Sequence, residues 1–418
     1  GDFEGDLTIN SEFGSAIAAI GDLEADGVGD MVVGSPYQHS QGAVWVLFMN
    51  KNGTVDLETE ISFEEGGFNG NLNKDDAFGS AVAGIGDLDG DGFNDIAVGA
   101  PFDDDGGDNR GAVWILFLQA NGKVKAHQKI SDDAGSFSGK LEDNDAFGSA
   151  IATLGDLDGD GITELAVGAP LADDNGIDAG AVWILFMNMD GSVRSHKKLS
   201  GNSGRLKDVL VAGDQFGQSL SNLGDFDKDG VTDLVAGSPG MDDDGLDRGA
   251  IWILYLDTDG SVASKKEISA SKSELSLPIV DGDHFGEVVA NAGDIDEDGV
   301  TDIAVGLPFD DDGAADSGAV YILFMNKRAE IDEIQKISST QGIFSGILNS
   351  DDHFGAAIAS VGDLNNKRAV DLAIGAPLDD NGGIDKGAVW ILLLDEPDTR
   401  TECERDALLR FLGVGNCN

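Results

Sequence analysis

The residues with the clearest chemical potential are carboxylates that recur in short, glycine-containing loops. One such loop runs from Asp87 to Asp95, with acids at its first, third, fifth and ninth positions and glycines at its fourth and sixth. Oxygen ligands at this spacing, with the backbone carbonyl of Phe93 at the seventh position, can surround one hard cation and favour Ca²⁺ over zinc or copper. The glycines allow backbone angles that a β-carbon would resist. The loop is therefore predicted to bind calcium.

Four further loops share this pattern, so about five structural Ca²⁺ ions are predicted. The predicted ligands are, in chain order, Asp22, Glu24, Asp26 and Asp30; Asp87, Asp89, Asp91, Phe93 and Asp95; Asp156, Asp158, Asp160, Ile162 and Glu164; Asp225, Asp227, Asp229, Val231 and Asp233; and Asp294, Asp296, Asp298, Val300 and Asp302. The first copy has the longer Glu24 at its third position and is expected to bind less well. A sixth copy keeps Asp363, Asn365 and Asp371, but its Lys367 replaces the third acid, which disfavours a metal there. The alternative for these loops is an acidic turn without an ion.

The acidic loops belong to a unit that is repeated six times. Phe-Gly starts at residues 13, 78, 147, 216, 285 and 354, with four identical intervals, and a Gly-x-Pro triplet follows in each copy. In the second copy the pattern predicts strands over 80–88, 95–100, 112–118 and 124–130, of which the third is apolar throughout and the fourth is polar. Four antiparallel strands that stack through both faces form the blade of a β-propeller. The apolar third strand persists in the first and last copies, which favours a closed ring over a solenoid with polar end repeats.

One aromatic position recurs in the third strand of every unit. It is occupied by Trp45, Trp114, Trp183, Trp252 and Trp390, and by Tyr321 in the fifth copy. A ligand-stacking aromatic would be expected in only one or two loops. We therefore expect these residues to pack between blades.

The motifs Phe-Gly, Gly-Asp-Leu-Asp-Gly-Asp-Gly and Gly-Ala-Pro together resemble the FG-GAP repeat of integrin α-subunit propellers and of related microbial and algal proteins. The resemblance covers most of the chain. It implies an all-β fold, namely a six-bladed β-propeller of four-stranded antiparallel blades, and it implies that the acidic loops are the Ca²⁺ loops of these blades. Integrin propellers have seven blades, whereas six copies are present here, so integrin ligand contacts are not carried over to this chain.

The net charge constrains the partners. Asp and Glu number 78 against 26 Lys and Arg, which gives a formal net charge of −52. Such a surface repels nucleic-acid phosphates and anionic lipid headgroups, and no apolar run approaches the ~20 residues of a membrane span. We therefore expect no nucleic-acid partner and no direct membrane insertion. Bound cations would cluster the acids in loops, whereas adaptation to a salty medium would scatter them, and both explanations stay open.

A second acidic loop follows each Gly-x-Pro triplet except the first, as in Asp103-Asp104-Asp105. Aspartates cap turns by accepting hydrogen bonds from nearby backbone amides, which is the simpler interpretation, and further Ca²⁺ sites are the alternative. The first copy instead has a shorter, uncharged loop that contains Tyr37 and His39. Specificity in a symmetric scaffold usually lies where the symmetry breaks, so these two residues are candidate ligand contacts, with a simple truncation as the alternative.

The repeat ends near residue 394. We therefore predict a propeller over 1–394 and a C-terminal helical tail over 395–418, which opens with a capping-box sequence from Thr401 to Glu404. Cys403 and Cys417 flank the tail helix, and a disulfide between them would fit an oxidising compartment. The tail replaces the fourth strand of the last blade. That blade is expected to have three regular strands, with the tail, a flanking domain or a partner strand at its edge.

The expected function is calcium-stabilised recognition or adhesion by a secreted or cell-surface protein. The resemblance implies an extracellular protein or polysaccharide ligand, and calcium loops with a disulfide fit that location. His127 and His196 occupy one repeated position and His284 and His353 another. The sequence has no phosphate loop or nucleophile elbow, so no catalytic residue is predicted. The alternative is a carbohydrate-active enzyme, a lyase or hydrolase, because some FG-GAP relatives act on carbohydrates.

Overall fold

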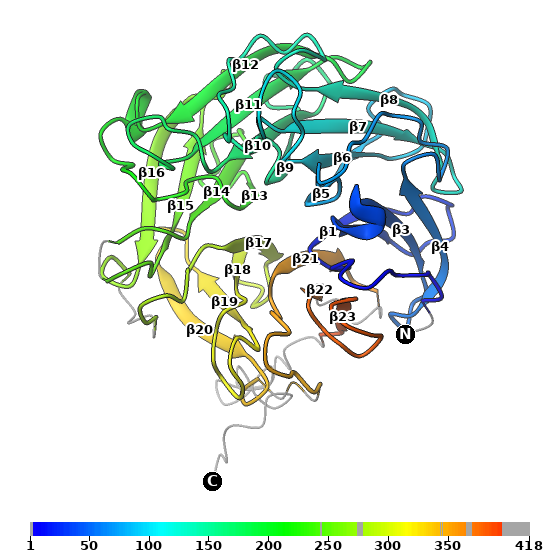
Figure 1. Ribbon diagram of the computed structural model, residues 1–418. Helices are drawn as coiled ribbons and strands as arrows, with labels where there is room; N and C mark the ends of the chain where they lie inside the picture. The colour runs from blue at the N-terminus through cyan, green and yellow to red at the C-terminus, as the bar shows by residue number, and fades with distance from the viewer. Residues whose placement is uncertain are drawn as a thin grey trace.

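The computed structural model describes residues 3–242, 245–273, 279–342, 344, 346–364 and 370–394. The strands of this part form six antiparallel sheets arranged around a central axis, and in each sheet the strand order follows the chain (Figure 1). From the innermost strand outwards, the blades are β1 (Ala16–Gly21), β2 (Asp30–Ser35), β3 (Ala43–Met49) and β4 (Val55–Ser62); β5 (Ala81–Gly86), β6 (Asp95–Ala100), β7 (Ala112–Leu118) and β8 (Val124–Ile130); β9 (Ile151–Gly155), β10 (Glu164–Ala169), β11 (Ala181–Met187) and β12 (Val193–Ser200); β13 (Leu220–Gly224), β14 (Asp233–Ser238), β15 (Ala250–Leu256) and β16 (Val262–Ser269); β17 (Val288–Gly293), β18 (Asp302–Leu307), β19 (Ala319–Met325) and β20 (Ile331–Ile337); and β21 (Ala357–Gly362), β22 (Asp371–Ala376) and β23 (Ala388–Leu392). The predicted all-β, six-bladed propeller is confirmed.

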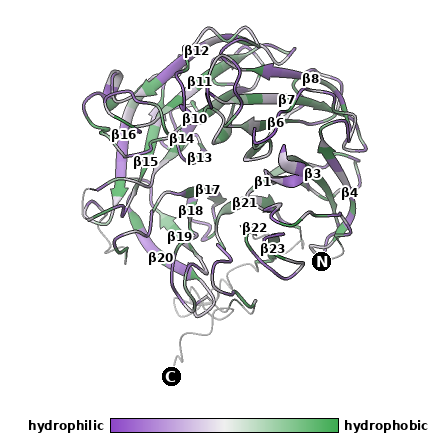
Figure 2. Cartoon of the chain, in the orientation of Figure 1, coloured by the Kyte–Doolittle hydropathy of each residue, from purple (hydrophilic) through white to green (hydrophobic). Residues whose placement is uncertain are grey.

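The polarity of the strands follows their distance from the axis. Every residue of β6 and β7 is buried, because both faces of the blade lie against neighbouring blades. The outer strand β8 has exposed and half-buried residues between its buried ends. Figure 2 shows hydrophilic colour along the outer strands β12, β16 and β20.

Six hydrophobic clusters fill the junctions between neighbouring blades, one at each junction. The cluster between the last and first blades joins Ala357 of blade six with Ile17 and Trp45 of blade one. The N-terminal segment seals the same junction, since the amide of Phe13 donates to the carbonyl oxygen of Lys386 at 3.1 Å. The ring is therefore closed by packing and by hydrogen bonds, as the apolar end repeats predict.

The glycine of each Gly-x-Pro triplet packs against the glycine of the Phe-Gly pair in the next blade. A Cβ on Gly99 would lie 2.0 Å from the carbonyl oxygen of Gly148, and a Cβ on Gly375 would lie 2.0 Å from that of Gly14. The closely packed backbone cannot shift far enough to make room for a side chain at these positions. These two motifs therefore set the close spacing of the blades, including the spacing where the ring closes.

An aromatic trio adds to four of the junctions. Trp114 is buried, its ring meets that of Phe68 edge-on with 5.2 Å between centroids, and Phe68 stacks on Phe78 at 5.3 Å. The equivalent trios are Phe3, Phe13 and Trp45; Phe137, Phe147 and Trp183; and Phe344, Phe354 and Trp390. The prediction that the tryptophans pack between blades is confirmed.

Blade six has three strands among the described residues, in agreement with the sequence analysis. The predicted helical tail over 395–418, with Cys403 and Cys417, lies outside the described residues, so the tail, the disulfide and the boundary at 394 remain predictions. The helices of the described part are the short 3₁₀ turns η1 (Gln38–Ser40) and η2 (Gly204–Leu206). Neither is long and apolar enough to cross a membrane.

Candidate functional site

Carboxylates converge in five loops, each at the turn between the first and second strands of blades one to five. In each loop three carboxylate oxygens from different residues lie within 4.8 Å of one another. The groups are Asp22, Glu24 and Asp30; Asp87, Asp89 and Asp95; Asp156, Asp158 and Glu164; Asp225, Asp227 and Asp229; and Asp294, Asp296 and Asp302. Like charges this close repel one another, and a hard cation among all-oxygen donors removes the repulsion. The donor set therefore fits Ca²⁺.

Backbone amides hold these carboxylates in place. In blade two the first acid of the loop, Asp87, accepts hydrogen bonds from the amides of Asp91 at 2.9 Å and Gly92 at 2.8 Å. The fifth acid, Asp91, accepts one from the amide of Phe93 at 3.0 Å. The first acids of the other four loops accept the equivalent glycine amide. Each loop is therefore folded around its acids by its own backbone.

The ninth acid of the loop is buried and ties the loop to the third strand. Asp95 accepts hydrogen bonds from the amides of Leu88 at 3.0 Å and of Leu118, at the end of β7, at 2.9 Å. Burial raises the pKa of Asp95 to about 6 and that of Asp302, its counterpart in blade five, to about 7. The ninth acid, predicted only as a ligand, therefore also has a mechanical role in linking the loop to the third strand.

The five groups contain most of the predicted ligands. The ninth acid belongs to the group in blades one, two, three and five, and the fifth acids Asp26, Asp91, Asp160 and Asp298 lie outside the group. In blade four the fifth acid Asp229 takes part and the ninth acid Asp233 does not. The seventh-position carbonyls of Phe93, Ile162, Val231 and Val300 remain predicted ligands, as does the complete set for each ion.

The loop of blade six keeps the mechanical role of its ninth acid. Asp371 is buried and accepts hydrogen bonds from the amides of Leu364 at 2.8 Å and Leu394 at 2.7 Å. Asn365 and Lys367 of this loop lie outside the described residues. The ninth acid of this loop therefore makes the same two links as Asp95 makes in blade two.

Lysines form ion pairs with the second acidic loops of blades two, three and five. Lys129 Nζ lies 2.7 Å from Asp103 Oδ2 and 2.6 Å from Asp105 Oδ2, and Asp103 is fully buried. The amide of Asn109 donates to Asp104 Oδ1 at 2.9 Å, which caps the turn. Equivalent ion pairs are Lys198–Asp174 in blade three and Lys336–Asp310 in blade five. These contacts support the capping interpretation over a second ring of Ca²⁺ sites.

The loop of blade one has its own internal contacts. Gln38 is buried and hydrogen-bonded to the N-terminal segment, and His39 Nε2 lies 3.0 Å from Glu60 Oε1. Glu60 pairs with the tryptophan of its blade as Lys129 does in blade two, so an acid stands here at the position of the lysine. His39 therefore has a structural partner. Tyr37 is 42% exposed, and His39 is exposed as well, so both candidate ligand contacts are accessible.

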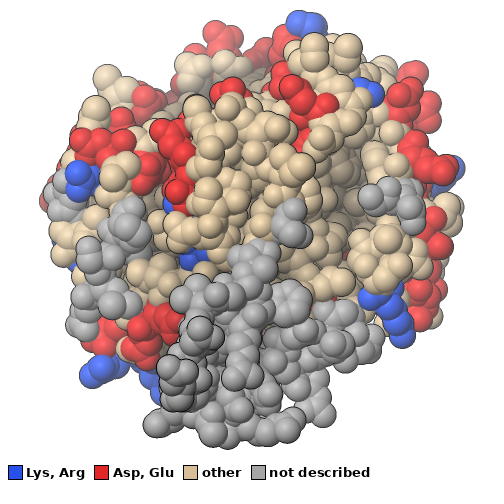
Figure 3. Space-filling view, turned by 90° about the horizontal axis from the view of Figure 1, so that it is seen from below, with Lys and Arg blue, Asp and Glu red and all other residues tan. Residues whose placement is uncertain are grey.

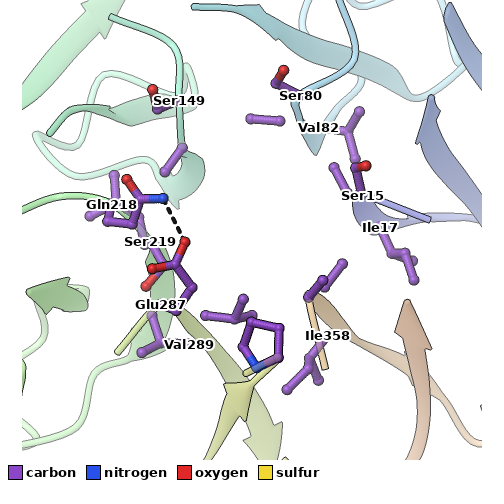
Figure 4. Close-up of a pocket in the computed structure, with 18 of the residues that line it drawn as sticks. Ser15, Ile17, Ser80, Val82, Ser149, Gln218, Ser219, Glu287, Val289 and Ile358 are labelled. Carbon is purple, nitrogen blue, oxygen red and sulfur yellow. Dashed lines mark hydrogen bonds between the residues drawn. The ribbon is translucent and has the colours of Figure 1, made fainter. Parts of the chain in front are cut away.

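The mouth of the channel along the central axis is lined by residues that differ between blades, and it was not predicted from the sequence. The residues that follow Phe-Gly lie around it, with Ser15 and Ser80 on one side and Ser149, Gln218 and Glu287 on the other (Figure 4). Gln218 Nε2 donates to Glu287 Oε1 at 2.9 Å, and burial raises the pKa of Glu287. This position differs between copies, and that variation was the available signal. The mouth can hydrogen-bond a polar ligand.

Many acids lie outside the five loops, since Asp and Glu number 78 and the predicted ligands in the five loops include 20 of them. Figure 3 shows acidic side chains over the visible face, with far fewer basic ones. The acids are therefore both clustered in loops and scattered over the surface. Both explanations of the negative net charge, bound cations and adaptation to a salty medium, retain support.

The six radial blades and the carboxylate groups in their inner turns define a β-propeller with cation-type loops. A family model described as FG-GAP repeat matches residues 13–47, 78–116, 147–185, 216–254 and 285–323. The unmatched sixth unit is the one whose acidic loop contains Lys367.

Integrin α subunits are similar to this chain. Integrin alpha-4 of Xenopus laevis is 34% identical over 178 residues, which cover 40% of this chain and 15% of that protein. Integrin alpha-2 of Mus musculus is 32% identical over 240 residues, or 56% of this chain and 18% of that protein. Integrin alpha-5 of Xenopus laevis is 33% identical over 241 residues, or 56% and 20%. The aligned regions span a fifth or less of these relatives. The protein is an integrin-like FG-GAP β-propeller.

Proposed function

We propose that this protein is a calcium-stabilised propeller, secreted or at the cell surface, that recognises a protein or polysaccharide ligand in an adhesion-type role. The observation that carries the proposal is the convergence of all-oxygen carboxylate groups at one position of five blades. The similarity to integrin α subunits supports the same function.

The ions are structural in this proposal. An ion bound by the first and third acids lies beside the ninth acid, whose buried carboxylate already bonds the end of the third strand. The positive charge offsets the repulsion among the acids and favours the ionised form of the ninth acid. Extracellular calcium modules have dissociation constants of about 10⁻⁴–10⁻³ M, which suits this location.

The proposed ligand face is the end of the ring opposite the calcium loops. In an antiparallel blade the turn between the second and third strands lies at the other end from the turn between the first and second. At that end the second acidic loops carry strongly exposed aliphatic residues, Ile177 at 71%, Leu246 at 64% and Ile384 at 62%. Blade one adds Tyr37. Apolar side chains among acids suit a partner surface that is itself basic and partly apolar.

Two of the histidines have structural surroundings. His127 packs edge-on against Phe68 with 5.1 Å between ring centroids, and His196 lies at the same distance from Phe137. Burial lowers the pKa of both histidines. We therefore propose binding as the function and assign no catalytic role to them.

A binding screen tests the proposal. The chain is passed over immobilised extracellular matrix proteins and polysaccharides, in calcium and then in EDTA. We expect at least one ligand to be retained in calcium, released by EDTA and bound again when calcium is restored. Calcium-independent retention, or release of saccharide products from a matrix polysaccharide, would contradict the proposal.

Variants test the proposed face within the same screen. The combined change Tyr37→Ala and Ile177→Ser is expected to weaken retention. Leu57→Ser is the matched control, because Leu57 is 62% exposed on the outer strand β4, away from that end of the ring. Equal effects of the two changes would place the ligand elsewhere.

A further inference from the structure

The residues at the mouth of the central channel form two tiers, because alternate residues of an extended segment face the same side. The first tier is the second residue after the phenylalanine of each Phe-Gly pair, namely Ser15, Ser80, Ser149, Gln218, Glu287 and Ala356. Each innermost strand begins beside its Phe-Gly pair and ends at the loop between the first and second strands. The first tier therefore lies at the end of the ring opposite the proposed calcium loops, on the proposed ligand face.

The second tier lies two residues further along the chain and is apolar. Its members are buried, branched aliphatic residues that line both the cavity at the mouth and a second cavity deeper in the channel: Ile17, Val82, Ile151, Leu220, Val289 and Ile358. The cavity at the mouth, which both tiers line, has a volume of about 320 Å³ (Figure 4). Sites for small molecules have volumes of about 300–1,000 Å³. This mouth cavity is therefore large enough for a small ligand group, with a polar entrance and an apolar base.

The first tier presents mainly hydrogen-bond acceptors. The hydroxyls of Ser15, Ser80 and Ser149 each donate to the carbonyl oxygen three residues earlier, at 2.7, 2.9 and 2.8 Å. Because a hydroxyl has one hydrogen, each serine oxygen can then only accept a hydrogen bond from a ligand. Gln218 Nε2 donates to Glu287 Oε1 at 2.9 Å, and the carboxyl group of Glu287 adds further acceptor capacity. The mouth cavity therefore suits a ligand that donates several hydrogen bonds.

The mouth cavity is almost uncharged, in contrast to the chain as a whole. Among the described residues that line it, Glu287 is the one carboxylate, and none is a lysine or arginine. Burial lowers the pKa of His353, which also lines the cavity, so this imidazole is uncharged at neutral pH. A basic peptide would find far more carboxylates in the outer loops, and an anionic ligand would find no cation here. The cavity therefore favours a neutral ligand.

The polar groups are spread around the cavity and do not converge on one point. Figure 4 shows Ser15 and Ser80 across the opening from Glu287. An ammonium group needs its acceptors close together, whereas the hydroxyls of a sugar are distributed around the edge of its ring. Phe309 forms part of the wall and is 37% exposed, and its ring meets that of His353 edge-on with 5.0 Å between centroids. Such an apolar wall can contact the C–H face of the same sugar ring.

We propose that the mouth cavity binds one neutral sugar residue of a glycan. The sugar hydroxyls donate to the first tier, and its C–H surface packs on the second tier and on Phe309. This role rests on the ligand recognition proposed above. It specifies the chemical class of the ligand and places the contact on the axis of the ring as well as in the outer loops.

Saturation-transfer NMR of the full chain in calcium tests the ligand class. The probes are the methyl glycosides of glucose, galactose, mannose and fucose, with methyl glucuronide as the anionic comparison and acetyl-arginine amide as the basic one. We expect at least one neutral glycoside to bind and methyl glucuronide not to bind. Binding of acetyl-arginine amide in place of every neutral glycoside, or binding of no probe at all, would overturn the inference.

A variant that fills the cavity locates the sugar. Ala356→Tyr adds a bulky side chain at the one first-tier position that has no polar group, so it is expected to abolish glycoside binding. Ala126→Tyr is the matched control, because Ala126 is exposed on the outer strand β8, away from the channel. Equal binding by Ala356→Tyr, Ala126→Tyr and the wild type would place the sugar elsewhere and refute the site.

Two smaller changes keep the test decisive if Ala356→Tyr fails to fold. Ser80→Ala and Glu287→Ala remove acceptors from opposite sides of the mouth, and each is expected to weaken glycoside binding about two- to tenfold. A ligand held by the carboxylate alone, as a cation would be, responds to Glu287→Ala and ignores Ser80→Ala. That result would overturn the proposal of a neutral sugar.

The outcomes separate this inference from the proposed function. If the chain retains a matrix protein or an acidic polysaccharide in calcium and binds no neutral glycoside, only the sugar site is refuted. The absence of any calcium-dependent retention in the binding screen would refute the proposed function, whatever the free glycosides do.

Discussion

The buried ninth acid provides the sharpest test of the loop architecture. Asp302 in blade five is fully buried and accepts hydrogen bonds from the amides of Ile295 at 2.8 Å and Met325 at 2.9 Å. The change Asp302→Ala removes both acceptors and the link between the loop and β19. Asp298→Ala in the same loop is the comparison, because Asp298 is itself exposed and accepts a hydrogen bond from the amide of Val300 at 2.8 Å.

The expected size of the effect follows from these contacts. Each buried amide left without an acceptor costs about 1–3 kcal/mol, so the two together cost about 2–6 kcal/mol in the free energy of unfolding. Burial raises the pKa of Asp302 to about 7, so its removal also relieves the cost of a poorly solvated acid. We therefore expect a net loss of about 2–4 kcal/mol without metal. Asp298→Ala should lose less than about 1 kcal/mol, because water can replace its bond.

Unfolding by urea, followed by circular dichroism in EDTA and in calcium, measures both variants. In EDTA only Asp302→Ala should be clearly destabilised. Both variants should bind calcium less tightly. In calcium, the free energy of unfolding of both should therefore be lower than that of the wild type. If Asp298→Ala costs as much as Asp302→Ala in EDTA, the ninth acid has no special mechanical role and the reasoning fails.

Three further changes probe the rest of the ring. Gly99→Ala should lower the melting temperature by many degrees, because the new Cβ would lie 2.0 Å from the carbonyl oxygen of Gly148, and a neutral result in calorimetry would contradict the contact. Lys129→Met should cost about 3 kcal/mol in urea unfolding, because it leaves the buried carboxylate of Asp103 without its ion pair. Burial raises the pKa of Asp76 to about 7, so the folded state holds this proton more tightly than the unfolded chain. Relative to Asp76→Asn, the wild type should therefore lose stability as the pH rises from about 4 through 7, and parallel pH profiles would refute this.

Much of the fold could be predicted because its determinants are local and repeated. The strands predicted over 95–100, 112–118 and 124–130 match β6, β7 and β8, since continuous apolar runs and an Asn-Gly turn specify them. The first strand is shorter than predicted, Ala81–Gly86 instead of 80–88, because a register shift near Gly84 and Gly86 ends the ladder at the acidic loop. That shift depends on pairing with the next strand, which a pattern along one segment does not show.

The candidate site could likewise be predicted only in part. The acids of each loop lie within nine residues, so their spacing alone predicted that Asp87, Asp89 and Asp95 would converge. The approach of Lys125 to that loop was not predicted, because it lies 36 residues from Asp89 and reaches it only through the fourth strand. Gln218 and Glu287 were missed for a related reason, since they come from neighbouring blades and meet only in the closed ring.

The amino-acid sequence by itself determined the repeat, the strand pattern, the composition of the acidic loops and the core position of the tryptophans. These features depend on short-range periodicity and on the chemistry of single residue types. Only the tertiary structure decided which acids are buried and bonded to the third strand, which basic side chains contact the acidic loops, and how the channel mouth is lined. Those properties arise when strands and blades far apart in the chain are brought together, and burial and charge pairing exist only in that assembled ring.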